Sequence, residues 1–225
     1  MIHESLFALL LTAASLGFIH TVLGPDHYVP FLAIARARNW SMPKTVTITT
    51  VCGLAHVGSS VIIGLVGLRL STELSRLKLI ESMRGELTAW LIIAFGLIYL
   101  IWAVKKKVSG HQKEDLMESL SGNDKQKPVN FKGLLPWTLF VVFLFGPCEP
   151  LIPLLMFPAA GISQGSIFLV AGIFGITTIA TMLVMVLVPL YGFKRIKIPL
   201  LQNYGQIIAA VLILFCGLGI QFMGL

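Results

Sequence analysis

Two short stretches of this chain combine helix-breaking residues with side chains that can bind a metal ion. The first runs from Gly24 to His27 (Gly-Pro-Asp-His) and the second from Gly146 to Glu149 (Gly-Pro-Cys-Glu), each within an apolar run. In lipid, both the backbone freed by a proline and an ionisable side chain need partners that hydrocarbon cannot provide. The two stretches are therefore the first candidates for a functional site.

The first half of the chain holds three histidines and one aspartate in or beside apolar runs. His20 and His27 are seven residues apart, or two helical turns, and therefore share a face of a regular helix. Imidazole suits nickel, cobalt, copper and zinc, and the carboxylate of Asp26 supplies negative charge. His20 or His56 alone could equally be a hydrogen-bonding link between helices, whereas the four together favour a functional site.

The second half contributes Cys148 and Glu149. Glu149 is the only acidic residue after Asp124, and its proline neighbours argue against a casual position on a helix surface. A buried, protonated carboxyl and a small apolar cysteine are the structural alternatives. With Asp26, Glu149 would match the charge of a divalent cation. The candidate metal ligands are His20, Asp26, His27, His56, Cys148 and Glu149.

The composition predicts an all-α integral membrane protein. Of its 225 residues, 56% are hydrophobic and 12% charged, and the mean hydropathy is +0.87, which leaves too little polar surface for a soluble globule. A span needs roughly 20 residues, so the long run at 150–193 holds the end of one helix and another whole helix. Six transmembrane helices follow from the uncharged runs 5–25, 45–68, 87–104, 133–148, 150–193 and 198–225.

Prolines should interrupt the first and fourth of these helices. The first, from about residue 5 to 36, would be broken at Pro25 and Pro30, and the fourth, from 133 to about 160, at Pro147 and the prolines that follow. The charged segment 71–86 predicts a short amphipathic helix along the outer interface. Residues 105–132 predict a flexible, charged cytoplasmic linker.

The two halves resemble each other at a nearly constant offset. Shifting the chain by 122 residues places Gly146-Pro147 on Gly24-Pro25 and Gly175 on Gly53, and an offset of 121 places Gly217 on Gly96. Three helices per half require the halves to enter the membrane in opposite directions. The predicted organisation is a 3+3 inverted repeat, with repeats at 1–104 and 133–225 joined by the linker 105–132.

The basic residues predict the orientation. Of the 17 Lys and Arg, three, seven and three lie in the first, third and fifth connecting segments, against four in the second. The positive-inside tendency then places both termini outside the cytoplasm of a multi-pass cell-membrane protein, with the N-terminal run as a retained helix. A basic rim facing anionic lipid explains the net charge of +7 without nucleic acid. The three cysteines form neither a disulfide framework nor a CxxC pair.

Residues 20–60 resemble the nickel/cobalt transporter family and its urease-accessory-like relatives. Those proteins carry a histidine, four residues and then Asp-His on an early helix, and a Gly-His-Ser type motif on the next. Here five residues separate His20 from Asp26-His27, and the second motif reads from Gly53 through His56 to Ser60. The resemblance implies a metal-ion permease with these residues as ligands.

The second half is similar to other members of the same broad superfamily. The stretch from Pro147 to Pro153 resembles the Pro-Cys-x-x-Pro helix of cytochrome c biogenesis thiol transporters, which use one cysteine from each repeat, although Asp26 occupies the partner position here. The superfamily also contains sulfite-exporter-like proteins. A thiol–disulfide conduit centred on Cys148 and a small-anion exporter are therefore the alternatives, although we expect no Arg or Lys within the membrane to hold an anion.

The preferred hypothesis is a permease for nickel or cobalt that works by alternating access at a midplane site. It is not an enzyme and needs no resident cofactor, because the metal ion is its cargo. Its expected partners are that ion and membrane lipid, with no nucleic acid.

Overall fold

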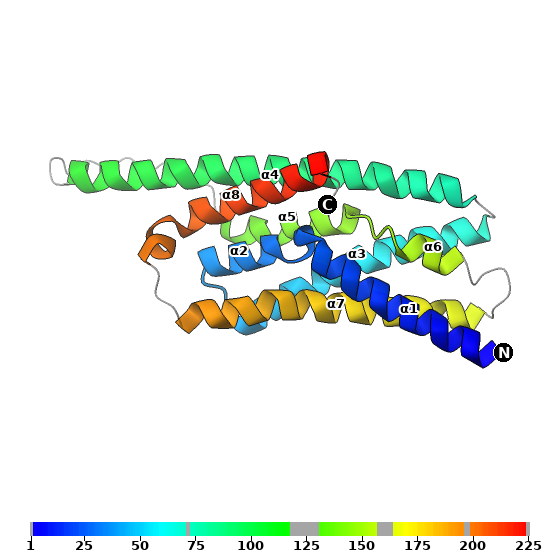
Figure 1. Cartoon of the computed structure of the whole chain (residues 1–225). Helices are drawn as coiled ribbons and strands as arrows, with labels where there is room; N and C mark the ends of the chain where they lie inside the picture. The colour runs from blue at the N-terminus through cyan, green and yellow to red at the C-terminus, as the bar shows by residue number, and fades with distance from the viewer. Residues whose placement is uncertain (1, 71–72, 118–130, 157–163, 196–198, 224–225) are drawn as a thin grey trace.

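The chain folds as an elongated bundle of helices (Figure 1). The computed structural model describes residues 2–70, 73–117, 131–156, 164–195 and 199–223, and these contain no β-strand. The elements are α1 (Ile2–Leu23), the 3-10 turn η1 (Pro25–His27), α2 (Val29–Ala37), α3 (Met42–Arg69), α4 (Leu74–Met117), α5 (Phe131–Phe145), α6 (Leu151–Met156), α7 (Gln164–Arg195) and α8 (Pro199–Met223).

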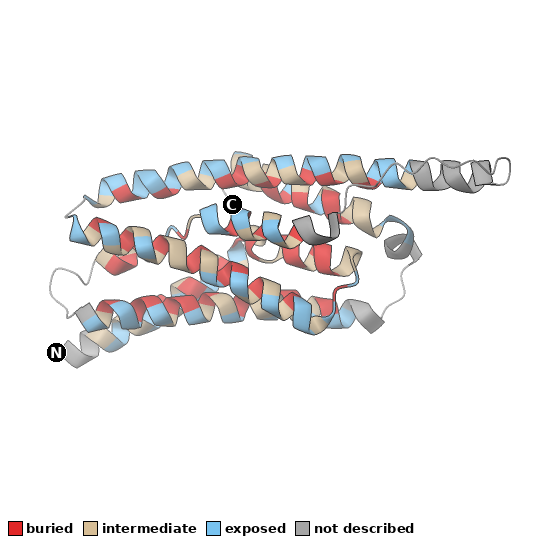
Figure 2. Ribbon diagram, turned by 180° about the vertical axis from the view of Figure 1, so that it is seen from behind, coloured by how far each residue is buried: buried red, intermediate tan, exposed pale blue. Residues whose placement is uncertain are grey.

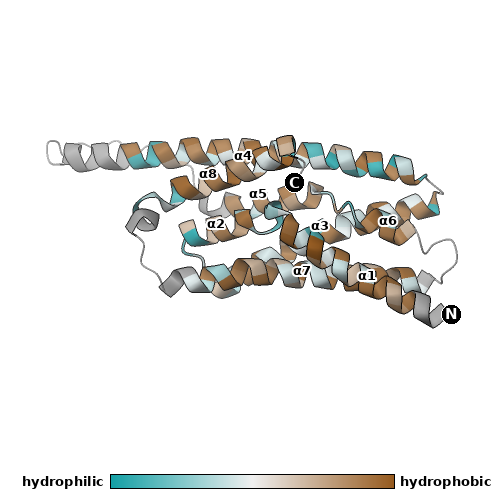
Figure 3. Ribbon diagram, viewed as in Figure 1, coloured by the Kyte–Doolittle hydropathy of each residue, from teal (hydrophilic) through white to brown (hydrophobic). Residues whose placement is uncertain are grey.

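Five helices are long and apolar enough to cross a membrane, which indicates a multi-pass membrane protein. Their apolar character shows as brown along most of the bundle in Figure 3. Within the described residues, the spans are Leu6–Leu23, Met42–Arg69, Leu74–Val108, Gly165–Gly192 and Asn203–Met223, with a shorter apolar helix at Leu135–Phe145. The all-α membrane class expected from composition is thus confirmed.

The chain leaves the α-helical path at both Gly-Pro stretches. The amide of Gly24 donates to the carbonyl of His20 at 3.0 Å, and the 3-10 turn η1 then separates α1 from α2. In the second stretch, α5 ends at Phe145 and α6 begins only at Leu151. Proline lacks the amide hydrogen that would continue the helical hydrogen bonds, which explains why both interruptions contain it.

The interfacial helix predicted at 71–86 is wrong, because α4 runs without interruption from Leu74 to Met117. No proline lies in this stretch to stop it, and two of its charged residues, Glu81 and Arg84, pair with each other. Arg84 falls within the candidate span Leu74–Val108, which at 35 residues is longer than a bilayer core of about 30 Å. The predicted linker 105–132 begins inside this helix, and residues 118–130 lie outside the described part.

Buried apolar side chains form two cores along the bundle, on the inward helix faces coloured red in Figure 2. Helix α4 packs along α8, α1 along α7, and α3 against α5 and α7. The large core contains Phe31, Tyr99 and Phe143, and the small core contains Val57 and Phe174. His56 precedes Val57 in the chain, and its ring lies 6.0 Å from that of Phe143, so it sits where the two cores meet.

Candidate metal centre

Three histidines from three elements converge inside the bundle. His20 lies in the last turn of α1, His27 in η1 and His56 midway along α3. One nitrogen from each ring can be chosen so that all three lie within 4.8 Å of one another. His27 and His56 are each 2% exposed, and His20 is partly buried. The arrangement has the ligand type of a transition-metal site and could hold a metal ion.

The break after α1 creates this convergence. The turn η1 places the ring of His27 between the other two, at centroid distances of 4.6 Å from His20 and 4.9 Å from His56. The rings of His20 and His56 are 6.4 Å apart. The seven-residue spacing of His20 and His27 predicted a shared face on a regular helix. The structure instead brings the two rings together through the turn.

Hydrogen bonds fix the orientation of the His27 ring. Its Nδ1 lies 3.0 Å from Oδ1 of Asp26 and 3.1 Å from the carbonyl oxygen of Gly24. Both neighbours are acceptors, so Nδ1 carries the hydrogen and Nε2 of the neutral ring keeps its lone pair. A carboxylate on the far nitrogen of a histidine is the usual support of a metal ligand. Asp26 therefore positions His27 rather than joining the group of three nitrogens.

The lone pair of His27 Nε2 points toward His56, whose Nε2 is 3.2 Å away. Two nitrogens bound to one ion at about 2.1 Å stand roughly 3.0 to 3.4 Å apart, so the observed separation suits a shared metal ion as well as a hydrogen bond. Nε2 of His20 and Nδ1 of His56 are buried and have no hydrogen-bond partner. An unpaired buried polar atom costs about 1–3 kcal/mol, which a bound ion would offset at His20.

The two candidates of the second half lie outside this group. The side chain of Cys148 is completely buried, and the residue's hydrogen bonds are those of its backbone amide and carbonyl. Glu149 is exposed and lines a cavity of about 660 Å³ together with His20, Asp26 and His27. Within the described residues, the histidines form the one group of three or more possible ligands at metal-binding distance.

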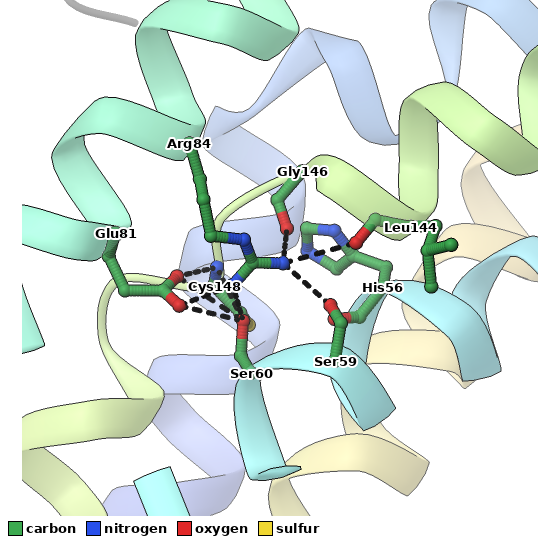
Figure 4. A network of polar contacts seen from close by, with 8 residues as sticks. All are labelled: His56, Ser59, Ser60, Glu81, Arg84, Leu144, Gly146 and Cys148. Carbon is green, nitrogen blue, oxygen red and sulfur yellow. Dashed lines mark hydrogen bonds and ion pairs between the residues drawn. The ribbon is translucent and has the colours of Figure 1, made fainter. Parts of the chain in front are cut away.

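The second break nevertheless touches the site from the other side. A Cβ atom at Gly146 would stand 2.9 Å from Nδ1 of His56, so only glycine allows this approach. Beyond Gly146, the amide of Cys148 donates to Oε2 of Glu81 at 2.9 Å, and Oγ of Ser60 lies 3.2 Å from the same amide. Figure 4 shows this network beside the ring of His56.

The central cation of the network is Arg84, which pairs with Glu81. Its guanidinium donates to the carbonyls of Leu144 and Gly146 at 3.1 and 3.0 Å, and to Oγ of Ser59 at 2.7 Å and of Ser60 at 3.1 Å. These carbonyls belong to the end of α5, where no further helical turn can bind them. An ion pair from α4 thus satisfies the backbone freed by the second break.

Sequence reasoning missed Glu81 and Arg84. A signal did exist, because Ser59 and Ser60 continue the polar face that begins at His56, and a polar face inside a bundle needs polar partners. The charged segment before residue 87 was the available source of such partners.

The three cysteines are free and buried, and they belong to different parts of the bundle. Cys52 packs in the large core, whereas Cys148 packs in the small core. Cys52 and Cys148 thus belong to different cores and form no disulfide in the described structure.

Comparisons of this chain with protein families, with characterised proteins and with solved structures found no match. The fold and the site therefore define a class of protein but no family. The chain has the helices of a multi-pass membrane protein, with a buried histidine cluster at a break in one of them.

Proposed function

We propose that this protein is a permease for a divalent transition-metal ion, with nickel or cobalt as the first candidates. The observation that carries the proposal is the convergence of His20, His27 and His56 at a helix break inside the bundle. These three are the proposed ligands, and Asp26 is their positioning residue. Cys148 and Glu149, predicted as ligands from sequence, take other roles here.

The chemistry of the donor set favours a transition metal over a hard cation. Neutral imidazoles are good ligands for nickel, cobalt, copper and zinc, whereas magnesium and calcium prefer oxygen atoms. A neutral histidine also costs far less to bury than a carboxylate, so a site of three imidazoles can exist in a membrane without its ion.

A permease needs two conformations, and an inverted repeat is a common way to obtain them. Two pairs of reciprocal glycine contacts support such a repeat. A Cβ atom at Gly53 would meet Ile179 at 3.0 Å, and one at Gly175 would meet Val57 at 3.1 Å. The offset of 122 maps Gly53 onto Gly175 and Val57 onto Ile179, so each contact is the image of the other.

The same reciprocity holds where α4 crosses α8. A Cβ atom at Gly96 would stand 2.8 Å from the backbone of Leu214, and one at Gly217 would stand 2.9 Å from the backbone of Ile93. The offset of 121 exchanges these two contacts as well. Contacts of this self-complementary kind are the signature of a twofold relation. They favour six spans in two oppositely oriented halves, with the short α5–α6 pair as the fourth.

The alternatives have weaker support. The separation of Cys52 and Cys148 disfavours the thiol–disulfide conduit. Arg84 is a partly buried cation of the kind an anion exporter would need, but its two terminal nitrogens already donate to Glu81, two serines and two carbonyls. An anion would have to displace these partners.

Uptake of Ni²⁺ into liposomes containing the purified protein tests the proposal. The His27→Ala variant removes the central ligand, and we expect its uptake to fall to the level of protein-free liposomes. His111→Ala, a histidine outside the cluster, is the matched control and should transport like the wild type. Equal uptake by the wild type and His27→Ala would refute the proposed site.

A further inference from the structure

The cavity beside the histidine cluster is lined by α1, η1, the N-terminal part of α4, the second break and the end of α8. Its volume is about 660 Å³. A water molecule takes up roughly 30 Å³ of liquid volume, so a metal ion with six waters needs about 180 Å³ for those waters. The cavity is therefore large enough for a fully hydrated cation.

The charged residues lining the cavity that the structure describes are acidic. Asp26, Glu86 and Glu149 lie on three different elements, and neither Lys nor Arg is among the lining residues. Glu86 belongs to the span Leu74–Val108 and is exposed. An ionisable residue within a membrane span faces water or the bundle interior rather than lipid. The cavity is thus a negative, water-accessible space.

Unpaired polar atoms also line this space. Thr88 is 5% exposed, and its Oγ1 has no hydrogen-bond partner. Oε1 of Gln221 and Nε2 of His20, on two other lining residues, are likewise buried without a partner. All three atoms can accept hydrogen bonds from the waters around a cation. These acceptor atoms are separate from the carboxylates. They independently indicate a ligand that carries hydrogen-bond donors, such as the waters around a cation.

The cavity reaches the histidines from one side. His20, Asp26 and His27 line it, whereas His56 does not. On the other side of the cluster, the rings of Phe31 and Phe143 are 4.6 Å apart, and Phe143 contacts His56. Both phenylalanines are buried in the large core, so apolar packing lies on that side of His56.

We infer that this cavity is a vestibule that holds a hydrated divalent cation, through Asp26, Glu86 and Glu149, before the ion exchanges its waters for the three histidines. The inference rests on the proposed function and adds a second, outer site to it. Because the outer site acts through charge and water, it should accept any compact multivalent cation, whereas selection among metals falls to the imidazoles.

The position of the vestibule also sets the side from which it opens. Its residues on α4 lie between Ser82 and Ala89. Arg38, at the end of α2, lies 4.6 Å from the ring of Trp102 and thus beside Lys105–Lys107, at the other end of the bundle. By sequence, 13 of the 17 Lys and Arg fall in the connecting segments of that end, against four at 69–84. Basic residues mark the cytoplasmic end. The vestibule therefore opens toward the opposite, extracytoplasmic side.

Hexaamminecobalt(III) is a suitable probe because its ammine ligands do not exchange, so it can occupy the outer site but cannot bind to the histidines. In equilibrium dialysis, the purified wild type and His27→Ala should bind it equally, and the Glu86→Gln/Glu149→Gln variant should bind it at least tenfold more weakly. Glu73→Gln is the control, because Glu73 is an exposed carboxylate just before α4 that does not line the cavity. Equal binding by the double variant and Glu73→Gln would overturn the inference.

Two further measurements separate this inference from the proposed function. The double variant should raise the apparent KM for Ni²⁺ uptake about tenfold and lower kcat little, since the histidines are intact.

A membrane-impermeant maleimide should label Glu149→Cys in intact cells, with protection by hexaamminecobalt(III). Labelling only in inverted vesicles would overturn the orientation. An absence of Ni²⁺ uptake by the wild type would refute the permease, while the dialysis would still test the outer site.

Discussion

At the break after α1, the backbone is satisfied locally. The amide of Gly24 bonds to His20, and the amide of His27 bonds to the carbonyl of Gly24 at 3.1 Å. At the break after α5, the carbonyls of Leu144 and Gly146 depend on Arg84, which comes from another helix. The two Gly-Pro stretches align in sequence, but only the second needs side chains from elsewhere in the bundle.

This difference suggests that the first break can bind an ion, whereas the polar contacts of the second break stabilise the fold. Because the first break satisfies its own backbone, the ring of His27 keeps Nε2 available for an ion. The second break carries no histidine, and its polar surroundings, Glu81, Arg84 and Ser60, are used on backbone groups. We therefore expect changes at the first break to affect metal binding and changes at the second to affect stability.

The largest effect should follow from Arg84→Met. It leaves the carboxylate of Glu81, which is 2% exposed, without its cation, and breaking a buried ion pair costs about 3–5 kcal/mol. The metal-free protein in detergent should unfold at a clearly lower temperature than the wild type. Glu81→Gln/Arg84→Met should recover part of the loss, because glutamine still accepts the Cys148 amide hydrogen. Arg76→Met, an exposed site on α4, is the control, and an equal loss there would contradict this role of Arg84.

An intermediate effect should follow from Asp26→Asn. The amide oxygen can still accept from Nδ1 of His27, but the negative charge that supports the ligand is lost. Loss of such a supporting carboxylate typically weakens metal affinity 10–100-fold. Titration calorimetry with Ni²⁺ should show this weakening, while the unfolding temperature of the metal-free protein stays close to that of the wild type. Unchanged affinity would show that the negative charge of Asp26 does not support His27 as a ligand.

The smallest effect should follow from Cys148→Ala. The thiol is buried among apolar residues, and the hydrogen bonds of this residue use its backbone amide and carbonyl, which alanine retains. Ni²⁺ uptake should therefore remain at the wild-type level, as in the control Cys216→Ala. Loss of uptake in Cys148→Ala alone would favour the thiol–disulfide conduit.

The sequence predicted the elements of the fold better than their partners. Apolar runs located the helices, and residue type made His20, His27 and His56 candidates, because several ionisable side chains together in such runs favour a functional site. The role of Arg84 was not predictable in this way, since its partner carbonyls are 60 and 62 residues distant. A charged segment next to an apolar run is typical of a membrane interface. Only the three-dimensional path of α4 shows that these charges face α3 and α5.

The uninterrupted course of α4 has a mechanical consequence. Arg84 fastens this helix to the end of α5, and 23 residues later Nζ of Lys107 donates to the carbonyl of Asn203 in α8 at 3.2 Å and lies over the ring of Tyr204. At 1.5 Å per residue, the two fastening points are about 35 Å apart, more than the thickness of a bilayer core. Helix α4 is thus a rigid connection between the second break and the beginning of α8. A shift of α4 along its axis would move both of these elements.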